Sequence, residues 1–362
     1  MKSEKKLQLD IVSKYRSQIY GFAAIWVVLH HAFDFHVFQL ESFGAVGTFI
    51  NKACMWGNMS VDIFLFLSGI SLYFAWEKNK DYGTFFKSRL KRIIPGFLLI
   101  VGPCAFYVFV LRPEGHVNDF FLIMSTMSLW FNGGRFCPWY VSGILLCYII
   151  YPAIHEFIHS RNDKNNKRRF VRYIIAMLFT YYVILGFHAY NEAYYQMIEL
   201  VLCRLPIFIT GCYIGKFVKE KKEISAKWWI PIIVLAVVYG ILRIKSDSYW
   251  YFRLPFILGA FSFTFILAYI FKVIDNIRSK SVKVINNFFS KTGEVSFEFY
   301  LTHVMFFKVV TMDSYFVYSK WLWLVGMIGA YLIAFLVKEL VDRWIKCIDS
   351  RKGGNVLKNT LK

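Results

Sequence analysis

Charged residues are scarce in this 362-residue chain, at 18% of the sequence against about 25% in ordinary soluble domains. The shortage is mainly acidic, because 23 Asp and Glu stand against 43 Lys and Arg. The seven cysteines are scattered without a C-x-x-C pair, so we expect neither a disulfide framework nor a metal site. Hydrophobic residues make up 57% of the chain, in runs of about 18–22 residues that match the bilayer thickness. This composition excludes a soluble globular enzyme, a disordered chain and a water-soluble nucleic-acid binder.

The apolar runs predict an all-α polytopic membrane protein. The lipid bilayer is therefore the first partner that we expect for it. A further apolar stretch at 118–131 is short and lies between two chain reversals, so we expect a re-entrant or interfacial segment there. We predict ten transmembrane helices, near 18–36, 59–76, 93–111, 138–155, 172–189, 196–215, 228–243, 252–271, 293–310 and 321–345.

The distribution of basic residues predicts the orientation of these spans. The segments on one side of the predicted bundle hold 34 Lys and Arg and those on the other side hold 8. By the positive-inside rule both termini are cytoplasmic. We therefore divide the chain into a cytoplasmic leader at 1–17, a transmembrane domain at 18–345 and a basic cytoplasmic tail at 346–362. No segment between spans exceeds about 25 residues, so any chemistry belongs to the membrane bundle and its loops.

Two neighbouring spans carry ionisable residues in their outer halves, where such groups are expensive and often functional. His30 and His31 lie about 20 Å along the helix axis from Arg16. Asp34 follows within one turn and would hold an imidazole as a general base requires. Asp62 enters the second span at the same depth, and we expect it to pair with His31. The alternative is a pair of interfacial histidines that face lipid headgroups.

The loop after the second span carries Arg89 and Arg92, three residues apart. On a helix they share one face and would clamp a phosphate group, although the same residues fit ordinary positive-inside decoration. Ser68, deeper in the second span, contacts substrate in one interpretation and merely permits close helix packing, with Gly69, in the other.

Three further residues have both a functional and a structural interpretation. Arg204 lies inside the sixth span and would bind an anionic group or form an ion pair with Glu199. His303 lies at mid-membrane depth, as a core histidine or a second site residue. Trp139 begins a span on the outer side, where it lines a substrate channel or belongs to an aromatic belt.

Six segments of the chain follow one another in an order that identifies a protein family more specifically than any single segment does. They are Arg16–His31 (Arg…Gly…His), Ser60–Gly69 (S-V-D-I-F-L-F-L-S-G), Arg89–Pro95 (R-L-K-R-I-I-P), Pro138–Tyr140 (P-W-Y), Arg204–Gly211 (R-L-P-I-F-I-T-G) and Ser296–His303 (S-F-E-F-Y-L-T-H). In this order they resemble the acyltransferase 3 family of integral-membrane acyltransferases. One departure is Tyr20, where many members have an arginine; Arg16, one turn earlier, takes that place. The family histidine aligns with His31 rather than His30.

The resemblance implies transfer of an acyl group, usually acetyl, from cytoplasmic acyl-CoA to a hydroxyl of a cell-surface or lipid-linked glycan. Acyl-CoA would be a co-substrate, and no cofactor would be bound permanently. Arg16, Arg89 and Arg92 would meet the CoA phosphates, and His31, oriented by Asp62 or Asp34, would remove the acceptor proton. Such enzymes modify polysaccharides of the cell envelope, which implies a multi-pass protein of a bacterial cell membrane.

Two other classes of protein fit ten spans. A transporter or flippase of a glycan or glycolipid would string its charges along a pathway and gives no role to the Arg89/Arg92 pair. A membrane anchor or assembly factor leaves the intramembrane Arg204 and Asp62 unexplained. Transfer of label from acetyl-CoA to an acceptor separates the enzyme from both.

Overall fold

A computed structural model describes residues 6–35, 37–38, 40, 43–134, 138–160, 165–245, 253–310 and 320–359. The first residues of the predicted leader and the last of the predicted tail, 1–5 and 360–362, lie outside the described residues. The structure is 87% helical, which confirms the all-α class.

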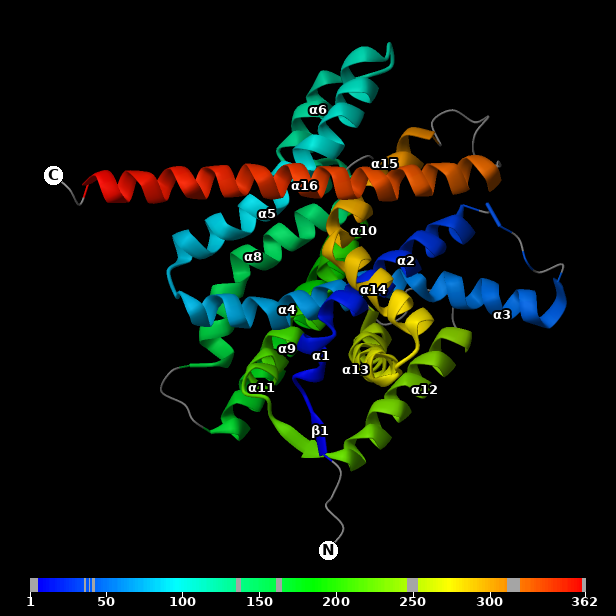
Figure 1. The fold of residues 1–362 in the computed structure, drawn as a ribbon, viewed down its shortest axis with the longest axis vertical. Coiled ribbons are helices and arrows are strands. Elements are labelled where there is room, and N and C mark those ends of the chain that lie inside the picture. Colours follow the sequence, from blue (N-terminus) through cyan, green and yellow to red (C-terminus); the bar gives the residue numbers. More distant parts are fainter. Residues whose placement is uncertain are drawn as a thin grey trace, which may run out of the picture.

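The described helices follow one another through the whole chain (Figure 1). They are α1 (Ile11–Lys14), α2 (Arg16–Asp34), α3 (Gly44–Met55), α4 (Ser60–Lys78), α5 (Tyr82–Phe106), α6 (Val117–Met124), α7 (Ser128–Asn132), α8 (Trp139–Ile158), α9 (Asn166–Tyr190), α10 (Glu192–Leu202), α11 (Leu205–Lys219), α12 (Trp229–Lys245), α13 (Leu254–Asn276), α14 (Lys280–Glu294), α15 (Ser296–Val310) and α16 (Lys320–Asn359). Short helical turns occur at Trp56–Met59, Tyr107–Leu111 and Ala226–Trp228, and two strands, β1 (Lys6–Gln8) and β2 (Glu223–Ser225), pair antiparallel with Leu7 opposite Ile224.

Eight stretches among the described residues are long and apolar enough to cross a membrane. Each overlaps one of the ten predicted spans, so the polytopic class is confirmed, whereas the count of ten and the cytoplasmic termini stay predictions. The eight stretches are Gly44–Lys78, Tyr82–Leu111, Trp139–Ile158, Asn166–Tyr190, Glu192–Lys219, Ala226–Arg243, Leu254–Asn276 and Lys320–Ser350.

The two predicted spans outside these eight are also helical. The span near 18–36 is α2, a 19-residue helix that begins at Arg16 and includes His30, His31 and Asp34, polar side chains that lower its hydropathy. The span near 293–310 is α15, which has 15 residues. Both helices pack against each other and against the rest of the bundle.

Several segments between the predicted spans form helices that the sequence did not predict. The stretch at 118–131 forms the short helices α6 and α7, of 8 and 5 residues, each too short to cross a bilayer. The predicted outer loop at 37–58 contains α3, and the predicted loop at 272–292 contains most of α14. The predicted span at 196–215 is interrupted, because α10 ends at Leu202 and α11 begins at Leu205.

Glycines set the closest helix contacts of the bundle. A Cβ built on Gly69 of α4 would lie 2.5 Å from the carbonyl oxygen of Phe208 in α11, and one on Gly211 of α11 would lie 2.2 Å from the carbonyl oxygen of Phe66. The same relation joins α2 to α14, because a Cβ on Gly21 would lie 1.9 Å from the carbonyl oxygen of Phe289. These backbones approach only because a hydrogen replaces the side chain.

Helix α16 runs along one side of the bundle, where it contacts α5 and α15 (Figure 1). At the other end of the chain, β1 pairs with β2, and α1 lies against α13. The Tyr15 hydroxyl, just after α1, donates a hydrogen bond of 3.0 Å to the Asp275 carboxylate of α13. The leader is thereby attached to the bundle through a strand and a helix, and α2 enters the bundle from a fixed position.

Candidate active site

A cavity of about 800 Å³ lies among α2, α4, α5, α8, α15 and α16. Four residues that the sequence singled out line it together: Arg16, Ser68, Arg89 and Arg92. These residues come from three helices that are separate in sequence, so their meeting is a result of the fold. The cavity is large enough for a small-molecule ligand or for the greater part of a nucleotide-like one.

The arginine end of the cavity is densely charged. Arg16 donates a hydrogen bond of 3.2 Å from Nη1 to the Ser71 hydroxyl of α4, which holds its guanidinium at the cavity wall. Arg89 and Arg92 lie one turn apart on α5, and the Arg89 guanidinium lies 5.8 Å from the centre of the Phe85 ring. Helix α16 adds charges of both signs to the lining, at Lys338, Glu339, Asp342, Arg343 and Lys346.

The other end of the cavity is aromatic. Its lining includes Tyr20 of α2, Phe64 of α4, Tyr140 of α8 and Tyr300 of α15. Their rings form a connected series, with centroid distances of 5.6 Å between Tyr20 and Phe64 and 6.2 Å between Phe64 and Tyr140. Tyr140 and Tyr300 follow at 5.3 Å. A ligand would therefore meet charge at one end and ring faces at the other.

Two predicted histidines lie just beyond the aromatic end. The His303 ring is 5.7 Å from Tyr300 and 5.5 Å from His31, between centroids. His303 is completely buried, and its Nδ1 donates a hydrogen bond of 2.8 Å to the Phe299 carbonyl, because a carbonyl oxygen only accepts. That bond fixes the tautomer with the lone pair on Nε2. Neither histidine lines the cavity itself.

Asp62 does not form the predicted pair with His31 among the described residues. Its carboxylate instead accepts a hydrogen bond of 2.6 Å from Arg253 Nη2, and Arg204 Nε lies 3.6 Å from the same oxygen. All three side chains are almost completely buried. A guanidinium carries a full charge and several donors, so it compensates a buried carboxylate better than a neutral imidazole does. Asp34, by contrast, keeps a carboxylate oxygen within 4.8 Å of a ligand atom of each of His30 and His31.

Arg204 occupies the break between α10 and α11, and Pro206 lies in the first turn of α11. Its Nη1 donates to the Leu200 carbonyl at 2.7 Å, and its guanidinium lies 4.6 Å from the centre of the Trp139 ring. Both residues therefore have structural contacts that the sequence did not predict: the Trp139 ring covers the Arg204 guanidinium, and Arg204 lies beside the Asp62 carboxylate.

Sequence reasoning missed Arg253. It lies just before α13 with a φ of 59°, a left-handed conformation that is uncommon outside glycine, and its guanidinium lies 3.6 Å from the centre of the Phe256 ring. The sequence placed it among the basic residues of an outer loop. The signal that could have found it is the need of the buried Asp62 carboxylate for a cationic partner. No spacing rule, however, connects two residues so far apart in the chain.

A family model described as an acyltransferase domain, that of the acyltransferase 3 family, matches residues 20–339. The chain belongs to the acyltransferase 3 family. Neither the curated proteins nor the solved structures contain a match. The protein is accordingly a membrane acyltransferase.

Five of the six segments that carried the resemblance contribute residues to the cavity lining, and Arg204–Gly211 contributes none. The acyltransferase motif at the start of α15 contributes Ser296, Glu298 and Tyr300 to the lining, and His303 follows one turn later. In the α4 motif, Ser68 lines the cavity whereas Gly69 packs against α11. Ser68 is therefore placed where it could contact a ligand, and Gly69 is placed where it permits close helix packing.

One group among the described residues has metal-binding composition, namely His30, His31 and Asp34, whose ligand atoms lie within 4.8 Å of one another. All three residues lie at the C-terminal end of α2, which places a carboxylate beside two imidazoles.

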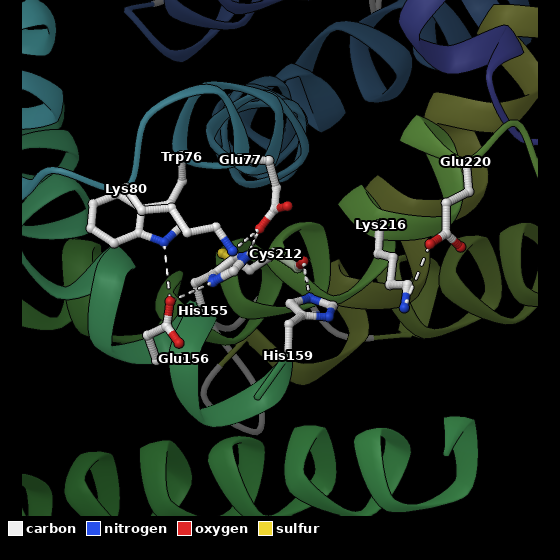
Figure 2. A network of polar contacts seen from close by, with 9 residues as sticks. All are labelled: Trp76, Glu77, Lys80, His155, Glu156, His159, Cys212, Lys216 and Glu220. Atoms are coloured by element: carbon white, nitrogen blue, oxygen red, sulfur yellow. Dashed lines mark hydrogen bonds and ion pairs between the residues drawn. The ribbon is translucent and has the colours of Figure 1, made fainter. Parts of the chain in front are cut away.

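A second polar network lies away from the cavity and joins α4, α8 and α11 (Figure 2). His155 is buried between two carboxylates, with Glu77 Oε1 at 3.2 Å and Glu156 Oε1 at 3.5 Å. Trp76 Nε1 donates to the Glu156 carboxylate at 3.4 Å. Figure 2 shows these side chains converging from α4 and α8, so the network ties the ends of those helices together.

Proposed function

We propose that this acyltransferase moves an acetyl group from cytoplasmic acyl-CoA to a hydroxyl of a cell-surface or lipid-linked glycan in a bacterial cell membrane. The carrying observation is the single cavity that combines Arg16, Arg89 and Arg92 at one end with aromatic side chains and neighbouring histidines at the other. Acyl-CoA has the same division, with phosphates on one side and a neutral thioester on the other.

The charged end suits the nucleotide part of acyl-CoA. Guanidinium groups bind phosphate oxygens through paired, charge-assisted hydrogen bonds, and Arg89 and Arg92 present two of them from one helix face. Arg16 adds a third from α2. The pantetheine arm would extend between the helices, past Ser68, and bring the thioester to the aromatic end.

At the aromatic end the chemistry requires a base. The acceptor oxygen attacks the thioester carbonyl carbon, the carbon–sulfur bond breaks, and CoA leaves as the thiolate. His31 takes the proton of the hydroxyl on its imidazole, and Asp34 is the carboxylate close enough to stabilise the imidazolium. Asp62, bonded to Arg253, has a structural part in this scheme: it compensates Arg204, between α10 and α11, and Arg253, just before α13. Holding both reactants in one closed space supplies much of the rate.

The experiment is transfer of labelled acetyl from acetyl-CoA to an acceptor glycan by the purified protein in membranes. We expect His31→Ala to abolish transfer but to bind CoA as the parent protein does, and Arg89→Gln with Arg92→Gln to weaken CoA binding. Full activity of His31→Ala would overturn the assignment of the base and favour His303 or His30.

The transporter alternative predicts a different outcome of the same assay. If acetyl and other acyl groups all fail to reach any acceptor while a glycolipid crosses the membrane, the catalytic proposal fails. Deletion of the gene followed by mass analysis of surface glycans tests the acceptor, because loss of acetyl removes about 42 Da from each modified sugar.

A further inference from the structure

Three aromatic rings line the end of the cavity that is nearest to the histidines. Phe64, Tyr140 and Tyr300 line the cavity, are each less than a tenth exposed, and come from three different helices. His303 lies behind Tyr300, at 5.7 Å between ring centroids, and does not line the cavity. The histidine pair therefore lies beside this cluster of rings, and we call Phe64, Tyr140 and Tyr300 the aromatic wall.

The wall is closely packed. Tyr140 and Tyr300 meet edge to face at 5.3 Å between centroids, and Phe64 and Tyr140 are tilted at 6.2 Å. An aromatic ring is about 3.5 Å thick, so separations of this size are direct ring contacts with no room for an alkyl chain between them. A short acyl group would rest against the wall, whereas each further methylene would have to displace a ring.

Contacts with neighbouring helices also fix the position of the aromatic wall. Tyr300 belongs to α15, whose next turn is fixed by the hydrogen bond of His303 to the Phe299 carbonyl and by that of Thr302 Oγ1 to the Ala330 carbonyl of α16, at 2.9 Å. Phe64 stacks on Tyr20 of α2 at 5.6 Å. Displacing these rings would therefore disturb three helix contacts rather than one exposed side chain.

Resting on the proposed use of acyl-CoA, we propose that the aromatic wall sets the length of the acyl group, so that the protein accepts acetyl and excludes chains of about six carbons or more. Tyr140 is the determining residue, because its ring contacts both other members of the wall. Removing that ring opens space at the thioester end, where each methylene that becomes buried favours binding about fourfold.

The test is acyl transfer from acetyl-, butyryl-, hexanoyl- and octanoyl-CoA by the full-length protein in membranes, for the parent chain, Tyr140→Ala and Tyr140→Phe. We expect the parent to prefer acetyl over hexanoyl at least tenfold. Tyr140→Ala should raise the hexanoyl-to-acetyl ratio at least tenfold. Tyr140→Phe, which keeps the ring and loses only the hydroxyl, should retain the parent profile.

A second measurement keeps the inference falsifiable when a variant does not fold. Competition of the four acyl-CoAs for the parent protein should show octanoyl-CoA binding at least tenfold more weakly than acetyl-CoA, and Phe64→Leu should reduce that difference. Equal use and equal binding of all chain lengths by the parent would overturn the inference and leave the acyltransferase proposal intact. Absence of transfer from every acyl-CoA would overturn the proposed function instead.

Discussion

The buried ion pair between Asp62 and Arg253 predicts a large and selective loss of stability on Asp62→Asn. The carboxylate lies 2.6 Å from Arg253 Nη2 and 3.6 Å from Arg204 Nε, and the three residues are 1%, 3% and 3% exposed. The substitution keeps the shape of the side chain and removes its charge. Both guanidinium groups then lose their shared carboxylate in a site that water does not reach.

The expected cost follows from the depth of the pair. Two unit charges about 4 Å apart interact by about 4 kcal/mol at an effective dielectric constant of 20, and loss of one member of a buried pair costs about 3–5 kcal/mol. We therefore expect Asp62→Asn to lower the free energy of unfolding by about 3–5 kcal/mol. Removing Arg253 as well should cost less than the sum of the two single losses, with a coupling of about 0.5–3 kcal/mol.

The assay is reversible unfolding in mixed detergent micelles, with Asp349→Asn as the matched control. Asp349 makes an ion pair of the same length, 2.6 Å, with Lys91, but its side chain is 57% exposed. That control should lose at most about 1 kcal/mol, because water screens exposed pairs. Equal losses for Asp62→Asn and Asp349→Asn, or strictly additive losses for Asp62 and Arg253, would refute the reasoning.

Three further predictions concern packing, the cation–π contact and a helix cap. Gly211→Ala should cost at least about 1–3 kcal/mol of unfolding free energy in the same assay, because the new Cβ would meet the Phe66 carbonyl oxygen at 2.2 Å; unchanged stability would show that α4 and α11 separate readily. Trp139→Leu should cost about 0.5–2 kcal/mol by removing the ring from Arg204, and Trp139→Phe should restore part of it. Asp81→Ala should weaken the start of α5 at neutral pH and change nothing in strong acid. The hydrogen bonds from the Thr84 side chain and backbone lower the pKa of the Asp81 carboxyl. Its contribution to stability is therefore present above the ordinary carboxyl pKa and disappears as the pH falls through the lowered value. A pH-independent loss of helix, measured by circular dichroism, would contradict this prediction.

Hydropathy and charge predicted the class of this protein because both depend on the local sequence. A run of apolar residues crosses a bilayer whatever its neighbours are, so eight of the predicted spans coincide with long apolar helices. The same method misjudged α3 and α14, which lie between predicted spans. Both helices pack against α2, and the close approach of Gly21 in α2 to Phe289 in α14 is a contact that local sequence does not reveal.

The motif order predicted that Arg16, Arg89 and Arg92 belong to one site, and the fold shows how they come to line one cavity. Arg16 and the Arg89/Arg92 pair are far apart in the chain, and they reach one cavity because α2 and α5 both pack against α15. The partner of Asp62 could not be predicted in this way. A buried carboxylate requires a cation, but which cation depends on a chain turn about 190 residues later, where Arg253 adopts a left-handed conformation.

The sequence by itself determined that this is a helical membrane acyltransferase with basic and histidine-bearing ends, since bilayer thickness, charge asymmetry and motif order are properties of the linear chain. Only the tertiary structure decided which ionisable groups compensate one another and which ring adjoins both the cavity and His303. The physical reason is that the cost of a buried charge and the size of a gap between side chains depend on neighbours from other helices, and these are fixed only when the helices pack.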